Sequence, residues 1–260
     1  MTRHIGDALR AEGYDLIICD SNTNPETELR NVRNMIKRSV DGIILMPVQN
    51  DPGILRLAAE AGVPVVCLDR RIDGMGCDSV TLDNISAAVS LTRLMLDHGH
   101  RRIAFIGSEK LYTGFRRLEG YKRAMKGAGL PPDPDLIYLD ELSLGTGYHG
   151  MKQMLKVEER PTAVVSGNYD VTLGIIMALY EAGLSYPADI SLAGFDNLLL
   201  ADIVRPRITV ADQPISRMAY EAVRLVLSRI TDPDTAEQPP REIVFPASIL
   251  IRESINSLDL

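Results

Sequence analysis

A regular alternation of apolar strands and amphipathic helices most constrains how this chain can fold. It is clearest in residues 159–213, where the apolar runs Ala163–Ser166 and Ser191–Phe195 each lead into a polar cluster. Between these runs lies an amphipathic stretch, residues 171–182, which Gly183 ends. This order of strand, helix and strand is typical of a parallel, doubly wound α/β sheet. In such sheets, ligands bind outside the carboxyl ends of the strands, where these polar clusters lie.

The same alternation continues along the rest of the chain. Further strands are expected over residues 14–20, 41–48, 63–69, 79–82, 102–107, 136–139 and 242–252. Further helices are expected over residues 1–12, 25–40, 51–61, 84–96, 115–128, 146–157 and 215–230. Two such series follow each other without a long linker, which predicts two similar α/β lobes.

Composition and charge narrow the class of protein. A hydrophobic content of 45% and a mean hydropathy of +0.00 are typical of a globular chain. The first residues are charged and no apolar run reaches membrane-spanning length, so we expect a cytoplasmic protein. A net charge of −7 argues against this chain alone gripping a polyanion such as DNA.

The sequence shows no pattern for a metal, a cofactor or catalysis. Cys19, Cys67 and Cys77 lack metal-ligand spacing, and the first two lie in apolar runs that predict buried free thiols. The histidines form neither a metal motif nor a triad. There is no nucleophile elbow, no P-loop and no glycine-rich dinucleotide motif after a strand. We therefore expect no cofactor, no metal and no enzymatic activity.

Several polar residues at predicted strand ends can bind a small polar ligand. Arg117 opens a helix after a strand and loop, and its planar fork suits a vicinal diol or a carboxylate; the alternative is a surface arginine like Arg116. Asp196 ends a buried run and either forms a turn with Asn197 or accepts from a ligand hydroxyl. Asp83 either binds ligand or caps the following helix.

Seven segments together resemble the LacI/GalR family of bacterial transcription regulators. They are VDGIILMP (40–47), GVPVVCLDR (62–70), VTLDN (80–84), GHRRIAFIG (99–107), RLEGYKRAM (117–125), DISLAGFDN (189–197) and FPASILIRES (245–254). Each segment alone is weakly specific, but their order and spacing are strongly so. The resemblance covers nearly the whole chain.

The resemblance implies a two-lobed, periplasmic-binding-protein-like fold with a doubly wound parallel sheet in each lobe. In that fold the chain crosses three times between the lobes, here expected near residues 96–101, 210–213 and 240–244. The amino-terminal lobe would combine residues 1–98 with 213–241. The carboxy-terminal lobe would combine residues 99–212 with 242–260.

The resemblance also implies a set of ligand-binding residues in the cleft between the lobes. It places the family's effector-contacting arginine at Arg117 and favours a ligand role for Asp196. Asn168 matches the first member of a family Asn-Asp pair, whose second position is Tyr169 here. The remaining implied positions are Asp83, Thr113, Leu142, Gln213 and Arg70. Leu142 stands where sugar-binding relatives often have an aromatic residue, and Arg70 either braces a hinge or binds ligand.

The implied function is the effector-sensing and dimerising core of a transcriptional regulator, with a sugar or similar metabolite controlling operator binding. The alternative is a solute-binding protein of a sugar transport system. In the family a helix-turn-helix precedes the core, and the core opens with a strand; neither is recognisable in this sequence. We therefore expect operator DNA to be bound only through a module outside this sequence, and a homodimer formed partly by helices 55–61 and 86–96. We also expect the first sheet to close up or swap a strand around residues 14–20, and the first lobe to be the less stable one.

Overall fold

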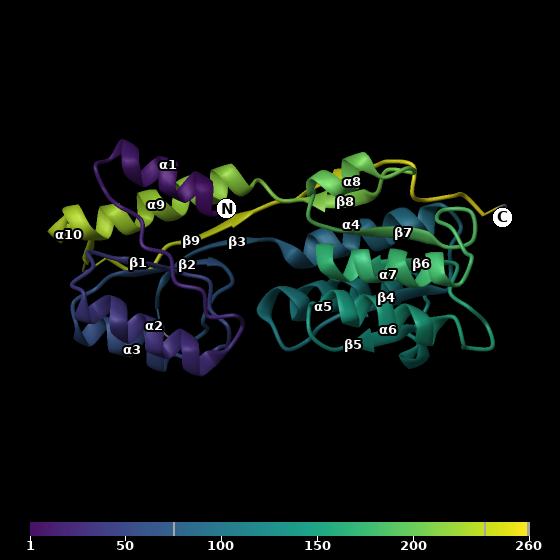
Figure 1. The fold of residues 1–260 in the computed structure, drawn as a ribbon, viewed down its shortest axis with the longest axis horizontal. Helices are drawn as coiled ribbons and strands as arrows, with labels where there is room; N and C mark the ends of the chain where they lie inside the picture. Colours follow the sequence, from purple (N-terminus) through teal and green to yellow (C-terminus); the bar gives the residue numbers. More distant parts are fainter. Residues whose placement is uncertain (75, 237, 259–260) are drawn as a thin grey trace. The chain divides into compact units, whose positions relative to one another are not determined.

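The computed structural model describes residues 1–74, 76–236 and 238–258 of the chain (Figure 1). The chain forms two compact units. The first contains Met1–Leu82 and Pro214–Phe245, and the second contains Asp83–Gln213 and Pro246–Leu260, of which residues 259–260 lie outside the described part. The chain therefore passes three times between the units, after Leu82, Gln213 and Phe245. The mixed α/β, periplasmic-binding-protein-like fold class is confirmed.

The first unit is built on a four-stranded sheet with the order β1-β2-β3-β9, and every pairing in it is parallel. Its strands are β1 (Ile43–Leu45), β2 (Val65–Asp69), β3 (Asp78–Leu82) and β9 (Glu242–Phe245). Its helices are α1 (Thr2–Ala11), α2 (Pro25–Lys37), α3 (Gly53–Glu60), α9 (Ile215–Thr231) and α10 (Pro233–Ala236). Figure 1 shows α1 and α9 on one face of this sheet and α2 and α3 on the other.

The second unit is built on a six-stranded sheet with the order β10-β8-β7-β6-β4-β5. Its strands are β4 (Ile103–Gly107), β5 (Ile137–Leu139), β6 (Ala163–Ser166), β7 (Ser191–Phe195), β8 (Thr209–Asp212) and β10 (Ser248–Leu250). Its helices are α4 (Asn84–Asp97), α5 (Tyr112–Gly127), α6 (Leu144–Met154), α7 (Tyr169–Glu181) and α8 (Leu199–Ile203), with a 3-10 turn at Pro134–Leu136. All pairings are parallel except that between β10 and β8.

The strands of the second sheet are apolar on both sides because helices cover both faces. In β4, Ile103 and Phe105 pack into the core beneath α4 and α5. The alternate residues Ala104 and Ile106 pack into the core beneath α6 and α7. Successive side chains of a strand point to opposite faces, so a strand buried on both sides reads as one continuous apolar run. This is why the sequence located these strands correctly.

The boundaries between the units differ from those expected. Helix α4 packs against α5 in the second unit, so residues 83–98 do not belong to the first. Strand β9 pairs with β3 in the first unit, with Val80 opposite Ile243. The expected strand 242–252 is in fact two strands, β9 and β10, separated at Pro246. Proline has no N–H to donate to a ladder, which favours a break there.

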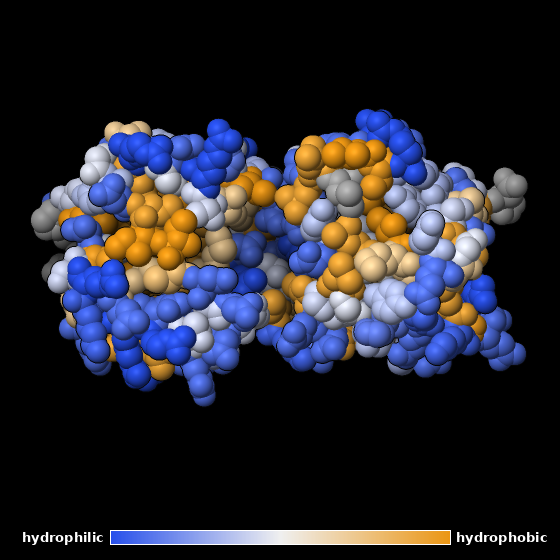
Figure 2. All heavy atoms as spheres, viewed as in Figure 1, coloured by the Kyte–Doolittle hydropathy of each residue, from blue (hydrophilic) through white to orange (hydrophobic). Residues whose placement is uncertain are grey.

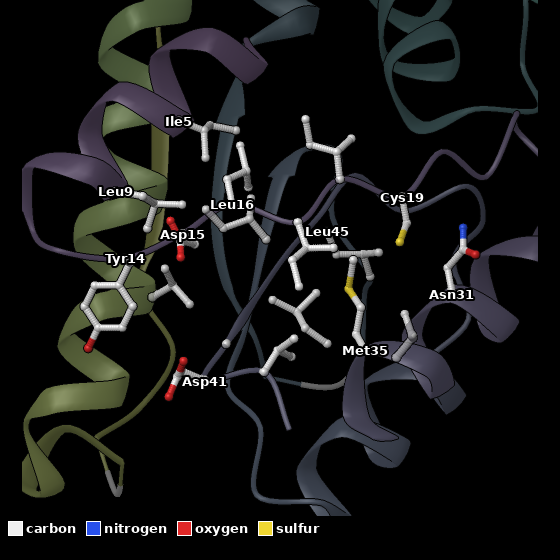
Figure 3. A pocket seen from close by; sticks show the side chains of 18 of the residues that line it. Ile5, Leu9, Tyr14, Asp15, Leu16, Cys19, Asn31, Met35, Asp41 and Leu45 are labelled. Carbon is white, nitrogen blue, oxygen red and sulfur yellow. The ribbon is translucent and has the colours of Figure 1, made fainter. Parts of the chain in front are cut away.

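Residues 14–20 form no strand, contrary to the sequence prediction. The sheet begins at β1, and β1 pairs only with β2, so these residues neither close up against β1 nor join the sheet. A cavity of about 940 Å³ separates the two, lined by Ile5 and Leu9 of α1, by Leu16 and by Leu45 of β1 (Figure 3). A strand needs a neighbouring backbone to satisfy its N–H and C=O groups, and none lies beside residues 14–20 in the described structure.

The apolar side chains of this segment are correspondingly exposed. Leu16, Ile17 and Ile18 have 37%, 49% and 66% of their surface accessible, and Cys19, predicted to be buried, is exposed. Figure 2 shows hydrophobic surface gathered on this part of the first unit, where the chain runs from α1 towards α2. Such surface costs free energy in water, at roughly 25 cal/mol per Å² of apolar area left exposed.

We expect the backbone amides of Leu16–Cys19 to exchange with solvent much faster than those of Ala104–Ile106. Within the described structure the first group makes no backbone hydrogen bond, whereas the second lies in the centre of a six-stranded sheet. Native-state hydrogen exchange followed by mass spectrometry measures both in one sample. Equal protection of the two segments would contradict the expectation that the first unit is the weaker one.

Within the described part of the chain, no helix has the length and apolarity needed to cross a membrane.

Candidate functional site

Arg117 lies in the first two turns of α5. The segments that contact it meet at one edge of the second sheet, where β4, β6 and β7 have their carboxyl ends. The Arg117 side chain is buried, with 2% of the residue exposed. Its Nε donates to Asn84 Oδ1 at 2.8 Å and its Nη1 donates to the carbonyl oxygen of Gly167 at 2.7 Å. Its guanidinium lies over the Phe195 ring, 4.0 Å from the centroid. The alternative of a surface arginine is therefore wrong, and the guanidinium is held in a fixed plane.

Two of these partners were not among the predicted site residues. Asn84 lies in the predicted helix 84–96, and Phe195 lies in the predicted strand Ser191–Phe195. The sequence offered one sign of each role, because each residue adjoins a predicted site residue at a strand end. Asn84 follows Asp83 in VTLDN, and Phe195 precedes Asp196. A side chain at a strand end can face either the core or the ligand, and the sequence does not distinguish these.

Asp196 and Gln213 form a second pair at the same edge. Gln213 Nε2 donates to Asp196 Oδ1 at 2.6 Å, and Gln213 Oε1 is buried with no hydrogen-bond partner among the described residues. Asp196 has a positive φ of 74°, uncommon for a residue with a side chain. Asn197 accepts from Arg252 Nη2 at 2.8 Å. Burial raises the pKa of the adjacent Asp212.

Asp83 and Asn168 are both helix caps. Asp83 accepts from the Ser86 N–H at 3.0 Å at the start of α4, so it caps this helix, which is one of the two roles expected for it. Asn168 Oδ1 accepts from the Val171 N–H at 2.9 Å at the start of α7, and its Nδ2 donates to the Leu142 carbonyl at 3.4 Å. Both caps place the amino ends of their helices at this edge of the sheet.

The other predicted residues of the second unit surround this edge less directly. Thr113 is buried on α5, one turn before Arg117. Tyr169 is the first residue of α7 and is half-buried. Leu142 packs against the core beneath α6 and α7. The structure thus supplies guanidinium, carboxylate, amide and phenol groups along one edge, groups that donate and accept hydrogen bonds in pairs as a polyol requires.

Arg70 belongs to the first unit and holds a loop there. Its Nη1 donates to the Pro47 carbonyl oxygen at 3.3 Å, and its Nε lies 3.7 Å from Asp69 Oδ2. The neighbouring Glu28 is buried and accepts from the Val48 N–H at 2.9 Å. Burial raises the pKa of Glu28, while the hydrogen bond from Val48 and the charge of Arg70 oppose that shift. Arg70 and Glu28 together fix the loop that follows β1.

The part of the chain that the structure describes contains no group of three or more His, Cys, Asp or Glu side chains placed to hold a metal. Its buried histidine has a structural role. His100 Nδ1 lies 2.9 Å from Thr162 Oγ1 and its Nε2 lies 3.0 Å from the Asn256 carbonyl oxygen. The imidazole thus joins the start of β4 to the segment that follows β10.

We expect the stability of the second unit to fall as the pH drops below about 6.5. Burial lowers the pKa of His100 from its ordinary value of 6.5, and the charge of His98 lowers it further. As the pH falls, the unfolded chain therefore binds this proton at a higher pH than the folded chain does. The contribution of neutral His100 to stability is full above pH 6.5 and is lost as the pH falls towards the lower folded pKa. Urea unfolding between about pH 7.5 and about pH 5, a range that spans the ordinary histidine pKa, measures this. The variant His100→Gln should show a flatter profile; an unchanged profile would assign the pH dependence to other groups.

The fold and this polar edge define the class of the protein. Residues 92–255 match the periplasmic binding protein-like domain family. The chain is 31% identical over 239 residues to the HTH-type transcriptional regulator RegA of Clostridium saccharobutylicum, covering 91% of this chain and 72% of RegA. The chain belongs to the LacI/GalR family of transcriptional regulators, of which it forms the effector-binding core.

Solved structures agree with this assignment. A LacI family regulator from Enterococcus faecium with bound ribose has a TM-score of 0.88 and 25% identity, covering 99% of this chain and 93% of that one. The complex of the transcriptional regulator CelR with cellobiose has a TM-score of 0.88 and 26% identity, covering 97% of this chain and 77% of CelR. These proteins are regulators, which favours the regulator over the transport alternative.

Proposed function

We propose that the carboxyl edge of the second sheet binds a sugar or a similar polyhydroxylated metabolite as effector. The observation that carries this proposal is the buried Arg117, held in one plane by Asn84, the Gly167 carbonyl and the Phe195 ring. A fixed guanidinium at the same edge as the Asp196–Gln213 pair adds donors to the acceptors of that pair without the entropy loss of ordering free side chains. The sugar complexes of the Enterococcus faecium regulator and of CelR support this ligand class.

The effector is proposed to act on operator DNA indirectly. In this proposal the chain forms a homodimer, and each protomer is joined to a DNA-reading module. Two such readers must match half-sites about one helical turn apart, so a change in the geometry of the dimer changes operator affinity. The effector shifts the equilibrium between two geometries of the dimer only by the difference between its affinities for them.

A thermal-shift screen tests the ligand class. Ribose, cellobiose, other pentoses and hexoses, and purine bases are compared at concentrations up to the millimolar range. A ligand at 100 times its Kd stabilises the folded state by about 2.7 kcal/mol, which is readily detected. Stabilisation by one or a few sugars supports the proposal, and stabilisation by purines alone would redirect it to another class of effector.

We further expect the chain to form dimers at tens of micromolar, measured by sedimentation velocity. The surface expected from the sequence would have to use the outer faces of α3 and α4. Leu55 and Ala58 of α3 and Leu91 and Met95 of α4 are buried inside their own units and are not available to a partner. A strict monomer at this concentration would contradict the proposed dimer, since obligate association depends on protomer concentration.

A further inference from the structure

Cys67 and Cys77 lie close together in the first unit. Cys67 is in the middle of β2 and is fully buried, and Cys77 directly precedes β3 and is partly exposed. Their Sγ atoms are 3.7 Å apart, and the Cys77 thiol also donates to the Val65 carbonyl oxygen at 3.1 Å. The two sulfur atoms thus lie close together between β2 and the residue that precedes β3.

The surroundings of the pair allow a small oxidant to enter. A cavity of about 290 Å³ is lined by both cysteines together with Gly74, Gly76 and Arg71. The two glycines carry no side chains that would narrow it. A buried thiol beside a partly exposed one is the arrangement of a resolving and an attacking cysteine in a redox-sensing pair.

The two thiols also differ in acidity. The hydrogen bond between them lowers the pKa of Cys77, while the burial of Cys77 opposes that shift. The same hydrogen bond, together with burial, raises the pKa of Cys67. Cys77 is partly exposed whereas Cys67 is fully buried, so Cys77 is the sulfur that an oxidant reaches first.

We propose that Cys67 and Cys77 are a reversible dithiol–disulfide pair that responds to hydroperoxides. The Cys77 thiolate attacks one oxygen of hydrogen peroxide; the O–O bond breaks, and the hydroxide that leaves is protonated to water. Cys67 Sγ then attacks the sulfenic sulfur of Cys77; the S–S bond forms, the S–O bond breaks, and the second water carries away the proton of Cys67. Two thiols lose two electrons in total and one peroxide gains them. A dithiol reductant reverses the change.

The disulfide would tie the start of β3 to the middle of β2. The connection between these strands carries Arg70 and Arg71, which bond the Pro47 carbonyl and Glu242. Closure requires the sulfur atoms to approach from 3.7 Å to about 2.05 Å. Disulfides of this kind in the reducing cytosol are usually transient and redox-sensing.

Peptide mapping tests the proposal on the whole protein. The chain is treated with hydrogen peroxide, remaining thiols are alkylated, and tryptic peptides are compared with and without reduction. Trypsin places Cys67 in peptide 57–70, Cys77 in peptide 72–93 and Cys19 in peptide 11–30. We expect peptides 57–70 and 72–93 to be joined, two of the three thiols to be lost, and a dithiol reductant to restore both.

Three variants sharpen the result. Cys77→Ser and Cys67→Ala should abolish the joined peptide, whereas Cys19→Ser, which changes the exposed third cysteine, should leave it unaffected. Circular dichroism checks that each variant is folded. If one variant does not fold, the peptide map of the wild-type protein still tests the proposal. Intermolecular disulfides through Cys19, over-oxidation of Cys77 without a link to Cys67, or no reaction at either cysteine would each overturn the proposal.

Discussion

Replacing Asp78 by asparagine is expected to lower the free energy of unfolding of the first unit by about 3–5 kcal/mol, because it leaves a buried cation without its counter-ion. The Asp78 side chain is 2% exposed and that of Arg229 is 11% exposed. Arg229 binds both carboxylate oxygens, Nε to Oδ2 at 2.9 Å and Nη2 to Oδ1 at 2.8 Å. The Arg241 N–H donates to Oδ1 at 2.7 Å. The carboxylate therefore joins β3 to α9 and to the segment before β9.

The pH dependence of the same site has a definite sign. Burial raises the pKa of Asp78, but the hydrogen bonds from Arg229 and Arg241 outweigh it and hold the pKa below its ordinary value of 3.8. A depressed folded pKa gives stability that is full above the unfolded pKa. That stability is lost as the pH falls below 3.8 through the lower folded pKa. Acid unfolding of the wild type should therefore include a step that Asp78→Asn lacks.

Urea unfolding monitored by far-ultraviolet circular dichroism measures the effect. Asp140→Asn is the matched control, because it removes an ion pair with Lys110 whose two side chains are largely exposed, and no measurable change is expected. The double variant Asp78→Asn, Arg229→Met should recover part of the lost stability, since no unpaired charge remains. A loss no larger than that of the control would show that the buried pair does not stabilise the unit.

Replacing Arg117 by alanine is expected to weaken effector binding by about 1–3 kcal/mol, roughly 5- to 150-fold in Kd. The change leaves Asn84 Oδ1 and the Gly167 carbonyl without the donors that Arg117 supplies. It also removes the cation above the Phe195 ring. Isothermal titration calorimetry with the sugar found by the thermal-shift screen measures the Kd.

The neighbouring arginine provides the matched control. Arg116 is partly exposed, forms an ion pair with Glu119 at 3.2 Å and lies over the Tyr112 ring. Arg116→Ala changes the same kind of residue on the same helix and should leave the affinity unaltered. Arg117→Lys keeps the charge but not the planar fork, so its affinity should also fall. Unchanged affinity for both Arg117→Ala and Asp196→Ala would exclude this edge as the binding site.

The candidate site could be predicted in part because strand ends are visible in the sequence. Arg117, Asp196 and Asn168 were found because each lies at or after the end of an apolar run, and the structure places all three at one edge of one sheet. Their contacts could not be found in this way. The hydrogen bond from Arg117 to Gly167 joins residues 50 positions apart, and the one from Gln213 to Asp196 depends on the pairing of β8 with β7.

The sequence by itself determined the order and type of most elements, because periodicity and helix punctuation are local properties. The doubly wound pattern, the caps at Asn24 and Asn168, and the continuous apolar strands of the second sheet all follow from neighbouring residues. Only the tertiary structure decided which elements share a unit. Helix α4 joins the second unit and β9 the first because each packs against a partner distant in sequence. Residues 14–20 have the composition of a strand but no partner backbone in the described structure, and the Asp78–Arg229 pair spans 151 positions. A strand or a buried ion pair exists only when its partner is in place, and that partner is set by the fold as a whole.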